Sequence, residues 1–389
     1  MNRSIIPNSQ QYMFEEKYVS FHSEDRNIVK YPNASEFEIE LPQDYCNVQG
    51  VKLASWSFPH NYNTFSISQK NIVLSFFIVQ QNPPSNPSAL ERAIFECLQK
   101  NYKNPFSATI TEGSYDPSTM AQEITNQMNE SINTYLLDCL KDSELIQEFL
   151  SNGGYSDFKV VYNKVKSNLW FGNLNSKFII PNIENNIFLR NAQLGKFQYP
   201  VYSNWGLGSY LGFIKNSPVE SVESPKYEDQ YIYPRFYYED GSKSYWLTNG
   251  SSTGLNPVFY LETPRKLNVE TNRCIYMEVD LLNSMDEYVP YDLNSFTVHT
   301  NESNGIVNSA FAKIPLRCSN QIYNFADSLK IYNPPAERIS KLKFRFRYHN
   351  GLLVEFDNNN YTFTLLFTLY RPQNQKKTHM FIPETIAFN

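Results

Sequence analysis

The segment FEIELPQDYCNVQGVKLASWSFP, residues 37–59, decides the fold. Apolar residues alternate with glutamates in its first half, and a period of two places the two kinds on opposite faces of a β-strand. Pro42 has no N–H to donate, so this strand is expected to stop there. A polar corner through Asp44 and Tyr45 then leads to a second alternating strand at Val51 and Leu53. Two half-buried strands predict a β-sandwich whose other strands cover the apolar face.

The same alternation returns near the end of the chain. After it, Asn350-Gly351 is typical of a tight hairpin turn, so residues 352–356 are expected to return as the second strand of a hairpin. Residues 361–370 alternate again and predict a further strand. The apolar residues of the first strand are Leu342, Phe344, Phe346 and Tyr348.

The composition is that of a globular protein rich in aromatic residues. Of the 389 residues, 41% are hydrophobic, 19% charged and 15% aromatic. This balance excludes disorder throughout the chain and favours sheets with large contact surfaces. The net charge of −5 argues against a dedicated nucleic-acid module, so no specific nucleic-acid partner is expected. The length allows one large β domain or two medium ones, and whether both halves share one core stays open.

The cysteines predict free thiols rather than a metal site. They are odd in number, far apart and without a C-x-x-C pair, which favours reduced thiols in a reducing compartment. No zinc site and no other cofactor is predicted. The first residues lack the apolar core of a signal peptide, and no apolar run predicts an integral membrane segment. The cysteines are Cys46, Cys97, Cys139, Cys274 and Cys318.

Helix signals interrupt the strand pattern. Ser88 is expected to cap a short helix, and Asp116 to cap a long one with Pro117 in its first position. A further helical piece is expected near residues 143–150, before two glycines. Apolar residues recur every fourth position along the long helix and predict one buried stripe: Met120, Ile124, Met128, Ile132, Leu136 and Leu140.

These signals predict an all-β protein, a jelly-roll-type antiparallel β-sandwich with an inserted helical region at about 88–150 and long loops. The sandwich is expected to span residues 32–370, with a helical insertion at 80–154 and a loop insertion at 216–256. A polar, irregular N-terminal arm, 1–31, and a C-terminal arm, 371–389, are expected to flank it.

The chain offers little catalytic chemistry. It contains no G-x-x-x-x-G-K-[ST] and no G-x-S-x-G motif. Glu278 and Asp280 share one face of a predicted strand, and a sandwich hydrolase would use such a pair as acid and nucleophile. The alternative is the solvated edge of an amphipathic strand. We therefore expect no catalytic residue and no enzyme.

Two kinds of side chain are candidates for binding partners. A basic stripe on the late strand has the charge to bind a nucleic-acid backbone or an acidic protein. Its structural alternative is an exposed strand face that Glu355 partly balances and that resists edge aggregation. The stripe consists of Lys341, Lys343, Arg345 and Arg347.

Aromatic side chains in predicted loops are the second kind, because aromatics are enriched in binding hot spots. They are alternatively packed under their own loops, or stacked on sugars in a carbohydrate-binding or host-attachment module. An apolar stretch after a polar spacer at the C-terminus is expected either to dock on a neighbour or to fold back on its own domain. The candidate residues are Tyr202, Trp205, Tyr231, Tyr233, Phe236, Tyr237, Tyr238, Phe381, Ile382 and Phe388.

Several blocks, in this order, resemble a known class of protein. They are residues 31–42 (YPNASEFEIELP), 47–59 (NVQGVKLASWSFP), 110–115 (ITEGSY), 211–213 (LGF), 334–347 (PPAERISKLKFRFR) and 349–356 (HNGLLVEF). Together they resemble the penton and minor capsid proteins of large icosahedral double-stranded DNA viruses, the nucleocytoplasmic large DNA viruses, which are built on jelly rolls. The resemblance spans most of residues 18–370.

The resemblance implies a non-enzymatic structural protein of the virion, assembled in the host cytoplasm. Its implied partners are the major capsid protein and other minor capsid proteins, with a homo-oligomer as a further possibility. The class supplies no catalytic residues to transfer.

Overall fold

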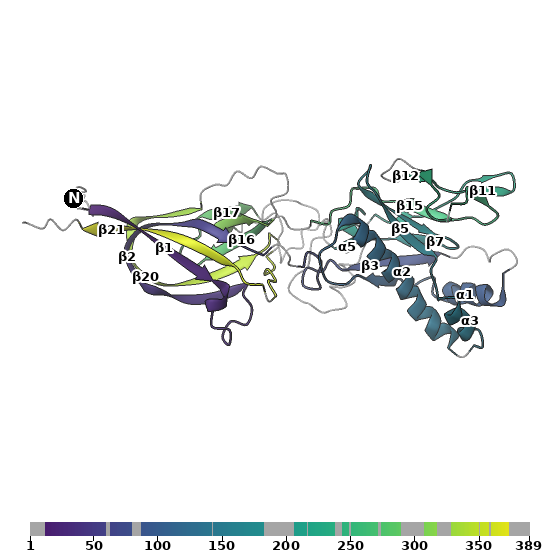
Figure 1. Ribbon diagram of the computed structural model, residues 1–389, viewed down its shortest axis with the longest axis horizontal. Coiled ribbons are helices and arrows are strands. Elements are labelled where there is room, and N and C mark those ends of the chain that lie inside the picture. The colour runs from purple at the N-terminus through teal and green to yellow at the C-terminus, as the bar shows by residue number, and fades with distance from the viewer. Residues whose placement is uncertain are drawn as a thin grey trace, which may run out of the picture. The chain divides into compact units, whose positions relative to one another are not determined.

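A computed structural model of the chain is shown in Figure 1. It describes residues 12–59, 63–79, 87–141, 143–182, 206–215, 217–237, 243–248, 250–270, 274–288, 307–316, 328–349, 351–357 and 359–372. Antiparallel strands dominate, and one region is helical. The predicted all-β, jelly-roll-type antiparallel β-sandwich with an inserted helical region is confirmed.

Contacts divide the chain into two compact units. Unit 1 comprises residues 1–60, 274–287 and 307–389, and unit 2 comprises residues 61–273 and 288–306. The two end segments of the sequence are therefore assigned to one unit, while residues 61–273 belong to the other.

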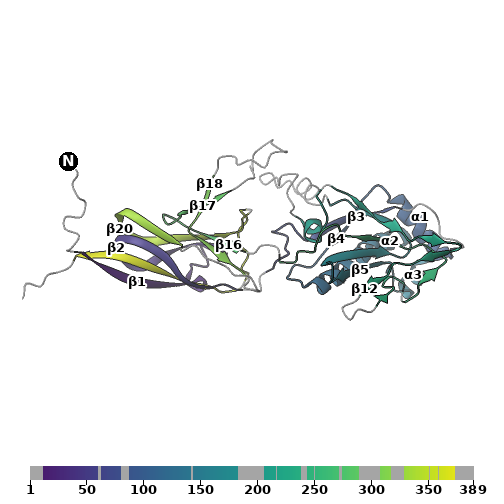
Figure 2. The same cartoon turned by 90° about the horizontal axis from the view of Figure 1, so that it is seen from above.

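Unit 1 is built on a six-stranded antiparallel sheet in the order β1-β21-β2-β20-β16-β19. Figures 1 and 2 show this sheet curling around its buried face. A separate two-stranded ribbon pairs β17 with β18. The bounds are β1 Tyr12–His22, β2 Glu36–Ser57, β16 Cys274–Val279, β17 Met285–Tyr288, β18 Val307–Ala310, β19 Ala312–Pro315, β20 Leu329–Arg347 and β21 Thr362–Pro372, with a short 3-10 helix η2 at Ser23–Asp25.

The early and late alternating segments close over one apolar layer, as their pattern predicts. Strand β2 lies between β20 and β21 and pairs antiparallel with both. Phe37 stands opposite Phe344 in the register, with ring centroids 5.4 Å apart. Tyr45 stacks on Phe367 at 4.6 Å. Aromatic rings thus fill the layer, and each buries a large area with favourable ring geometry.

Three predictions about these strands are wrong. Pro42 does not end a strand, because β2 runs unbroken through it; the ladder to β20 skips from Glu40 to Tyr45, so a bulge absorbs the missing N–H. Residues 352–356 form no strand, because β21 is the returning strand and it pairs with β2. They meet β20 through a bridge between Leu353 and Arg347 and through the ring of Phe356, which lies 5.8 Å from that of Phe346.

The N-terminal segment is the third. Residues 12–22 are not irregular; they form β1, an edge strand paired with β21 along its whole length. Val19 and Phe21 are buried. The alternating apolar pattern that they form is too short to stand out among the polar residues around it.

Unit 2 holds two four-stranded antiparallel sheets, β5-β6-β15-β9 and β4-β3-β7-β8. Both sheets and helix α2 contribute to one apolar core, and Phe158 of one sheet meets Phe76 and Phe178 of the other. The bounds are β3 Val73–Val79, β4 Phe106–Thr109, β5 Phe158–Asn163, β6 Asn168–Asn173, β7 Lys177–Ile180, β8 Val219–Glu220, β9 Val222–Glu223 and β15 Phe259–Glu262.

The predicted helices and their caps are confirmed. Ser88 and Glu91 form a capping box at the start of α1, Ala89–Lys100. Asp116 accepts hydrogen bonds from the first turn of α2, Pro117–Leu140, and the six residues of its predicted stripe are all buried. Two short helices follow, α3 Ile146–Ser151 and α5 Leu207–Tyr210.

The predicted loop insertion carries short strands of its own. They are β10 Lys226–Tyr227, β11 Gln230–Ile232, β12 Phe236–Tyr237, β13 Lys243–Ser244 and β14 Thr253–Gly254. Trp246 is buried in a small core of the insertion with Leu247 and Val258. A Cβ at Gly172 of β6 would lie 2.4 Å from the Trp246 ring, so only glycine allows this ring to sit on the sheet.

Candidate interaction surfaces

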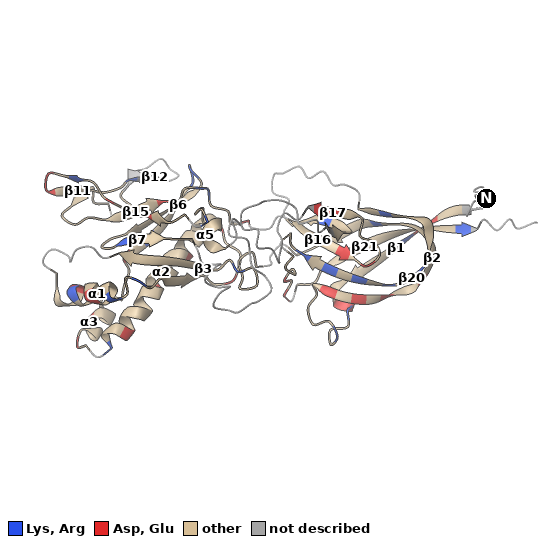
Figure 3. Cartoon of the chain, turned by 180° about the vertical axis from the view of Figure 1, so that it is seen from behind, with Lys and Arg blue, Asp and Glu red and all other residues tan. Residues whose placement is uncertain are grey.

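The basic stripe lies on the outer face of the unit 1 sheet, opposite the core. Here the strands alternate, with Phe37 and Phe344 inward and glutamates of β2 outward against the basic residues of β20. Lys343 Nζ lies 2.6 Å from Glu36 Oε1, and Lys341 Nζ lies 3.7 Å from Glu38 Oε1. Figure 3 shows the blue and red bands side by side. The stripe is therefore paired within the sheet, which favours its structural alternative over a nucleic-acid surface.

Arg347 departs from the rest of the stripe because it is buried. Its side chain is 2% exposed. Its Nε donates a hydrogen bond to Glu278, and its Nη1 lies 2.7 Å from Glu287 Oε2, an ion-pair distance without the alignment of a hydrogen bond. Glu287 also contacts His349 Nδ1. The guanidinium lies over the Tyr276 ring, 5.0 Å from its centroid. These groups tie β16, β17 and β20 together.

Ionisation in this cluster follows its packing. Burial opposes the charge on Glu287, but the contacts of its carboxylate with His349 and Arg347 outweigh it and lower the pKa of the carboxyl below its ordinary 4.5. Burial raises the pKa of the Tyr276 phenol. The cluster therefore holds Glu287 ionised and Tyr276 neutral at pH 7.

Glu278 is part of this network. Its carboxylate contacts Arg347 and lies 3.6 Å from Arg345 Nη1. Asp280 follows the end of β16, and its backbone N–H donates to Lys343 O. Glu278 thus pairs with two arginines, and the interpretation of Glu278 and Asp280 as acid and nucleophile has no support.

The aromatic candidates fall into three groups. Tyr231 and Tyr233 lie in the loop insertion of unit 2, half-buried, with Tyr233 Oη donating to Asn256 O at 3.0 Å. Phe236 and Tyr237 form β12, of which only the backbone is described. The other candidates lie outside the described residues: Tyr202, Trp205, Tyr238, Phe381, Ile382 and Phe388.

The most exposed side chains of the insertion are not the ones that the sequence singles out. Tyr231 and Tyr233 are predicted because aromatic residues are frequent in their segment, but both side chains are partly buried. The exposed apolar residues of the same part of the chain are Val222, Tyr227, Ile232 and Leu255. We call these four residues the unit 2 patch.

A second apolar group on unit 1 was not predicted. It consists of six residues on the outer face of the sheet, which we call the unit 1 patch: Phe14, Tyr18, Leu329, Ile331, Leu366 and Tyr370. Their inward-pointing neighbours Val19, Val51 and Phe367 are buried. They come from three distant segments, so only the register brings them together.

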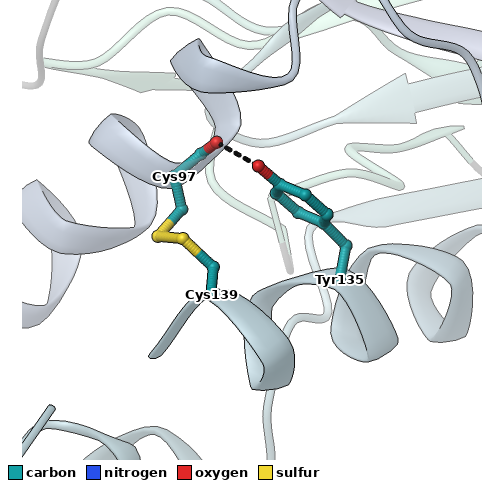
Figure 4. The surroundings of a disulfide bond; sticks show 3 residues. All are labelled: Cys97, Tyr135 and Cys139. Carbon is teal, nitrogen blue, oxygen red and sulfur yellow. Dashed lines mark hydrogen bonds between the residues drawn. A yellow bond between two sulfur atoms is a disulfide. The ribbon is translucent and has the colours of Figure 1, made fainter. Parts of the chain in front are cut away.

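A disulfide contradicts the prediction of reduced thiols. Cys97 of α1 and Cys139 of α2 are bonded across 42 residues, and Figure 4 shows Tyr135 donating to the Cys97 carbonyl beside the bridge at 2.9 Å. Spacing rules look for close pairs and cannot find two cysteines that meet through helix packing. Among the described residues, Cys46 and Cys274 are free thiols.

The described part of the chain holds no group of three or more His, Cys, Asp or Glu residues able to bind a metal ion. None of its helices is long and apolar enough to cross a membrane.

Comparisons with known proteins give only remote similarities. No protein-family model matches the chain, and no curated protein is significantly similar to it. Among solved structures, the mavirus penton protein matches 92% of this chain and 99% of its own at 10% identity and a TM-score of 0.29. A chain of the Sputnik virophage structure matches 92% of this chain and 98% of its own at 11% identity and a TM-score of 0.36. Scores this low carry no argument about function.

Proposed function

We propose that the chain is a non-enzymatic structural protein of a virus particle. Specifically, it is a minor capsid or penton-type component of a large icosahedral DNA virus, located in the capsid after assembly in the host cytoplasm. Its partners are the major capsid protein and other minor capsid proteins, and copies of the chain are further candidate partners. It binds no specific nucleic acid and needs no cofactor.

One observation carries this proposal: the chain exposes apolar surface on sheets that already have a buried core. The unit 2 patch and the unit 1 patch lie outside the two apolar layers that stabilise the units. Exposed groups of this kind mark interaction sites in soluble proteins. The sequence blocks that resemble capsid proteins support the same reading.

The mechanism is burial of the unit 2 patch between neighbours. Each contact contributes little, but a closed symmetric shell repeats it many times. Charge is arranged to match, because the exposed lysines of the stripe are already paired with glutamates and leave few unbalanced charges to desolvate. The protein then needs no reaction centre.

Particle composition tests the proposal. Intact particles are purified on a density gradient, and the chain is quantified against the major capsid protein by mass spectrometry. We expect a fixed copy number per particle that survives a salt wash. A ratio that varies between preparations, or loss of the chain in the wash, would contradict it, and tight binding of the isolated protein to a glycan array would favour an attachment module instead.

A paired variant locates the contact. Tyr227→Ser with Ile232→Ser removes apolar area from the unit 2 patch without touching the core, so incorporation is expected to fall several-fold while the fold is retained. Val165→Ser is the matched control, because Val165 is also exposed on unit 2 but lies apart from the insertion, in the turn between β5 and β6. Equal incorporation of both variants would exclude the unit 2 patch.

A further inference from the structure

The unit 1 patch has an arrangement that points to an occupant. Tyr18 of β1, Leu366 of β21 and Leu329 of β20 lie in one row across the sheet, with Lys52 of β2 between the last two. Ile331 lies in the next row. Tyr18 is 66% exposed and Ile331 60%. A sheet with one face on the core normally presents polar residues on the other, so this row lacks the expected character of a solvent face.

Phe14 and Tyr370 extend the patch to the end of the sheet. Their rings lie 4.9 Å apart, and Phe14 is exposed. Tyr12 pairs with Pro372 at the same end, so β21 leaves the sheet beside the patch. The chain then continues for 17 residues, from 373 to 389.

Those residues combine a spacer with an apolar segment. Residues 373–379, QNQKKTH, are polar, and residues 380–388, MFIPETIAF, are mostly apolar. An extended spacer of this length reaches roughly 25 Å, whereas the rows of Phe14 and Tyr18 are about 13 Å apart along the strand. The apolar segment can therefore reach every row of the patch.

Charge and composition select this segment over the other chain end. Lys376 and Lys377 lie in the spacer, and Glu16 is exposed on the outer face between Phe14 and Tyr18. The N-terminal residues 1–11 hold fewer large apolar side chains, chiefly Ile5 and Ile6. Attachment to the same chain gives either end an effective concentration near the millimolar range, which favours it over a segment of a second copy.

We propose that the unit 1 patch is the docking surface of residues 380–388 of the same chain. The apolar segment covers the exposed row in the isolated protein, and Lys376 and Lys377 lie near Glu16. This inference concerns the chain in solution and is independent of its place in a particle.

Cysteine trapping tests it on the full chain. Cys46, Cys274 and Cys318 are first replaced by serine, with the native disulfide between Cys97 and Cys139 kept. Ile331→Cys is then combined with Phe388→Cys, and the mixture is oxidised mildly. We expect a cross-link within one chain, seen as a faster band without reductant and as a linked peptide pair by mass spectrometry. Val165→Cys with Phe388→Cys is the control and is expected to cross-link at least ten-fold less.

Each other outcome overturns the proposal in a defined way. Equal yields at Ile331 and Val165 would show that the segment does not select the patch. A cross-link between two chains would assign the patch to a neighbouring copy. Cross-linking of Ile331→Cys to a cysteine at Ile6 instead would assign it to the N-terminal segment.

A second measurement avoids any effect of new cysteines. Deletion of residues 380–389 is expected to raise binding of the dye 1-anilinonaphthalene-8-sulfonate at least two-fold by uncovering the patch. In the Tyr18→Ser, Ile331→Ser background, the same deletion is expected to change dye binding little. Unchanged dye binding in the wild-type background contradicts the proposal. Failure here leaves the particle proposal standing, because purified particles test that separately.

Discussion

The outer face of the unit 1 sheet has two ends of opposite character, although the same strands build both. At one end, Glu36 and Glu38 of β2 face lysines of β20 in paired rows. At the other end, the same two strands present Leu329 and Ile331 beside Lys52 and Gly50. Both ends have buried apolar residues behind them, Phe37 and Phe344 at the first and Val51 and Phe367 at the second, so the core does not demand the difference. Exposed ion pairs keep the first end in water, and the second end is suited to a covering partner.

The largest effect on stability is expected at Arg347, the buried member of the charged end. Arg347→Met leaves Glu278 and Glu287 without their cation, and breaking a buried ion pair from one side costs about 3–5 kcal/mol. Faster hydrogen exchange in peptides of β16 and β20 would measure this. Arg345→Met is the control, because Arg345 is exposed and its contact with Glu278 is longer, at 3.6 Å. If both variants exchange alike, the buried cluster is not what holds this end.

Acid is expected to act next on the same cluster. The pKa of Glu287 is lower in the folded chain than its ordinary 4.5. Its contribution to stability is therefore present above about pH 4.5 and is lost as the pH falls through the folded value. Unfolding of unit 1 followed from pH 7 to pH 3 checks this. In Glu287→Gln, that part of the pH dependence should vanish, and an unchanged slope would contradict the assignment.

A smaller effect is expected in the exposed ladder. Lys343→Met removes one partially exposed ion pair, which is worth about 0.2–1 kcal/mol and weakens with salt. Denaturant midpoints at low and high ionic strength should differ for the wild type more than for the variant. A loss above about 2 kcal/mol would show that this end is more than a solvated face.

The smallest effect on stability is expected at the apolar end. Tyr18→Ser with Ile331→Ser changes two exposed side chains, and such changes usually stay within about 0.5 kcal/mol each. Thermal unfolding measures it. A large loss of stability would mean that the patch is part of the core, and the contrast between the two ends would collapse.

The sequence predicts best what period and local chemistry determine. Alternation in β2 and β20 identifies their inner faces, and Ser88 and Asp116 mark the helix starts because capping acts within one turn. It fails where pairing is non-local. β20 pairs with β2 and β16 rather than with the segment after Gly351, and nothing near the turn signals that exchange.

The candidate surfaces divide in the same way. The stripe at Lys341 and Lys343 can be predicted because it lies in one segment. Its partners on β2 cannot, because they are some 300 residues away in sequence, beyond any local pattern. The unit 1 patch needs register across three segments. Aromatic density led to Tyr231, but exposure depends on how the insertion folds.

The bond between Cys97 and Cys139 links the state of unit 2 to its chemical surroundings. It closes a 42-residue loop, and closing such a loop restricts the unfolded chain. Thiols in cytosol are kept reduced, and oxidants are available outside it. In reducing conditions α1 is held to α2 only by packing and by the Tyr135 hydrogen bond. A chain made in a reducing compartment therefore forms the bond between α1 and α2 only after it leaves. The oxidation state of these two cysteines then distinguishes chains that have left from chains that have not.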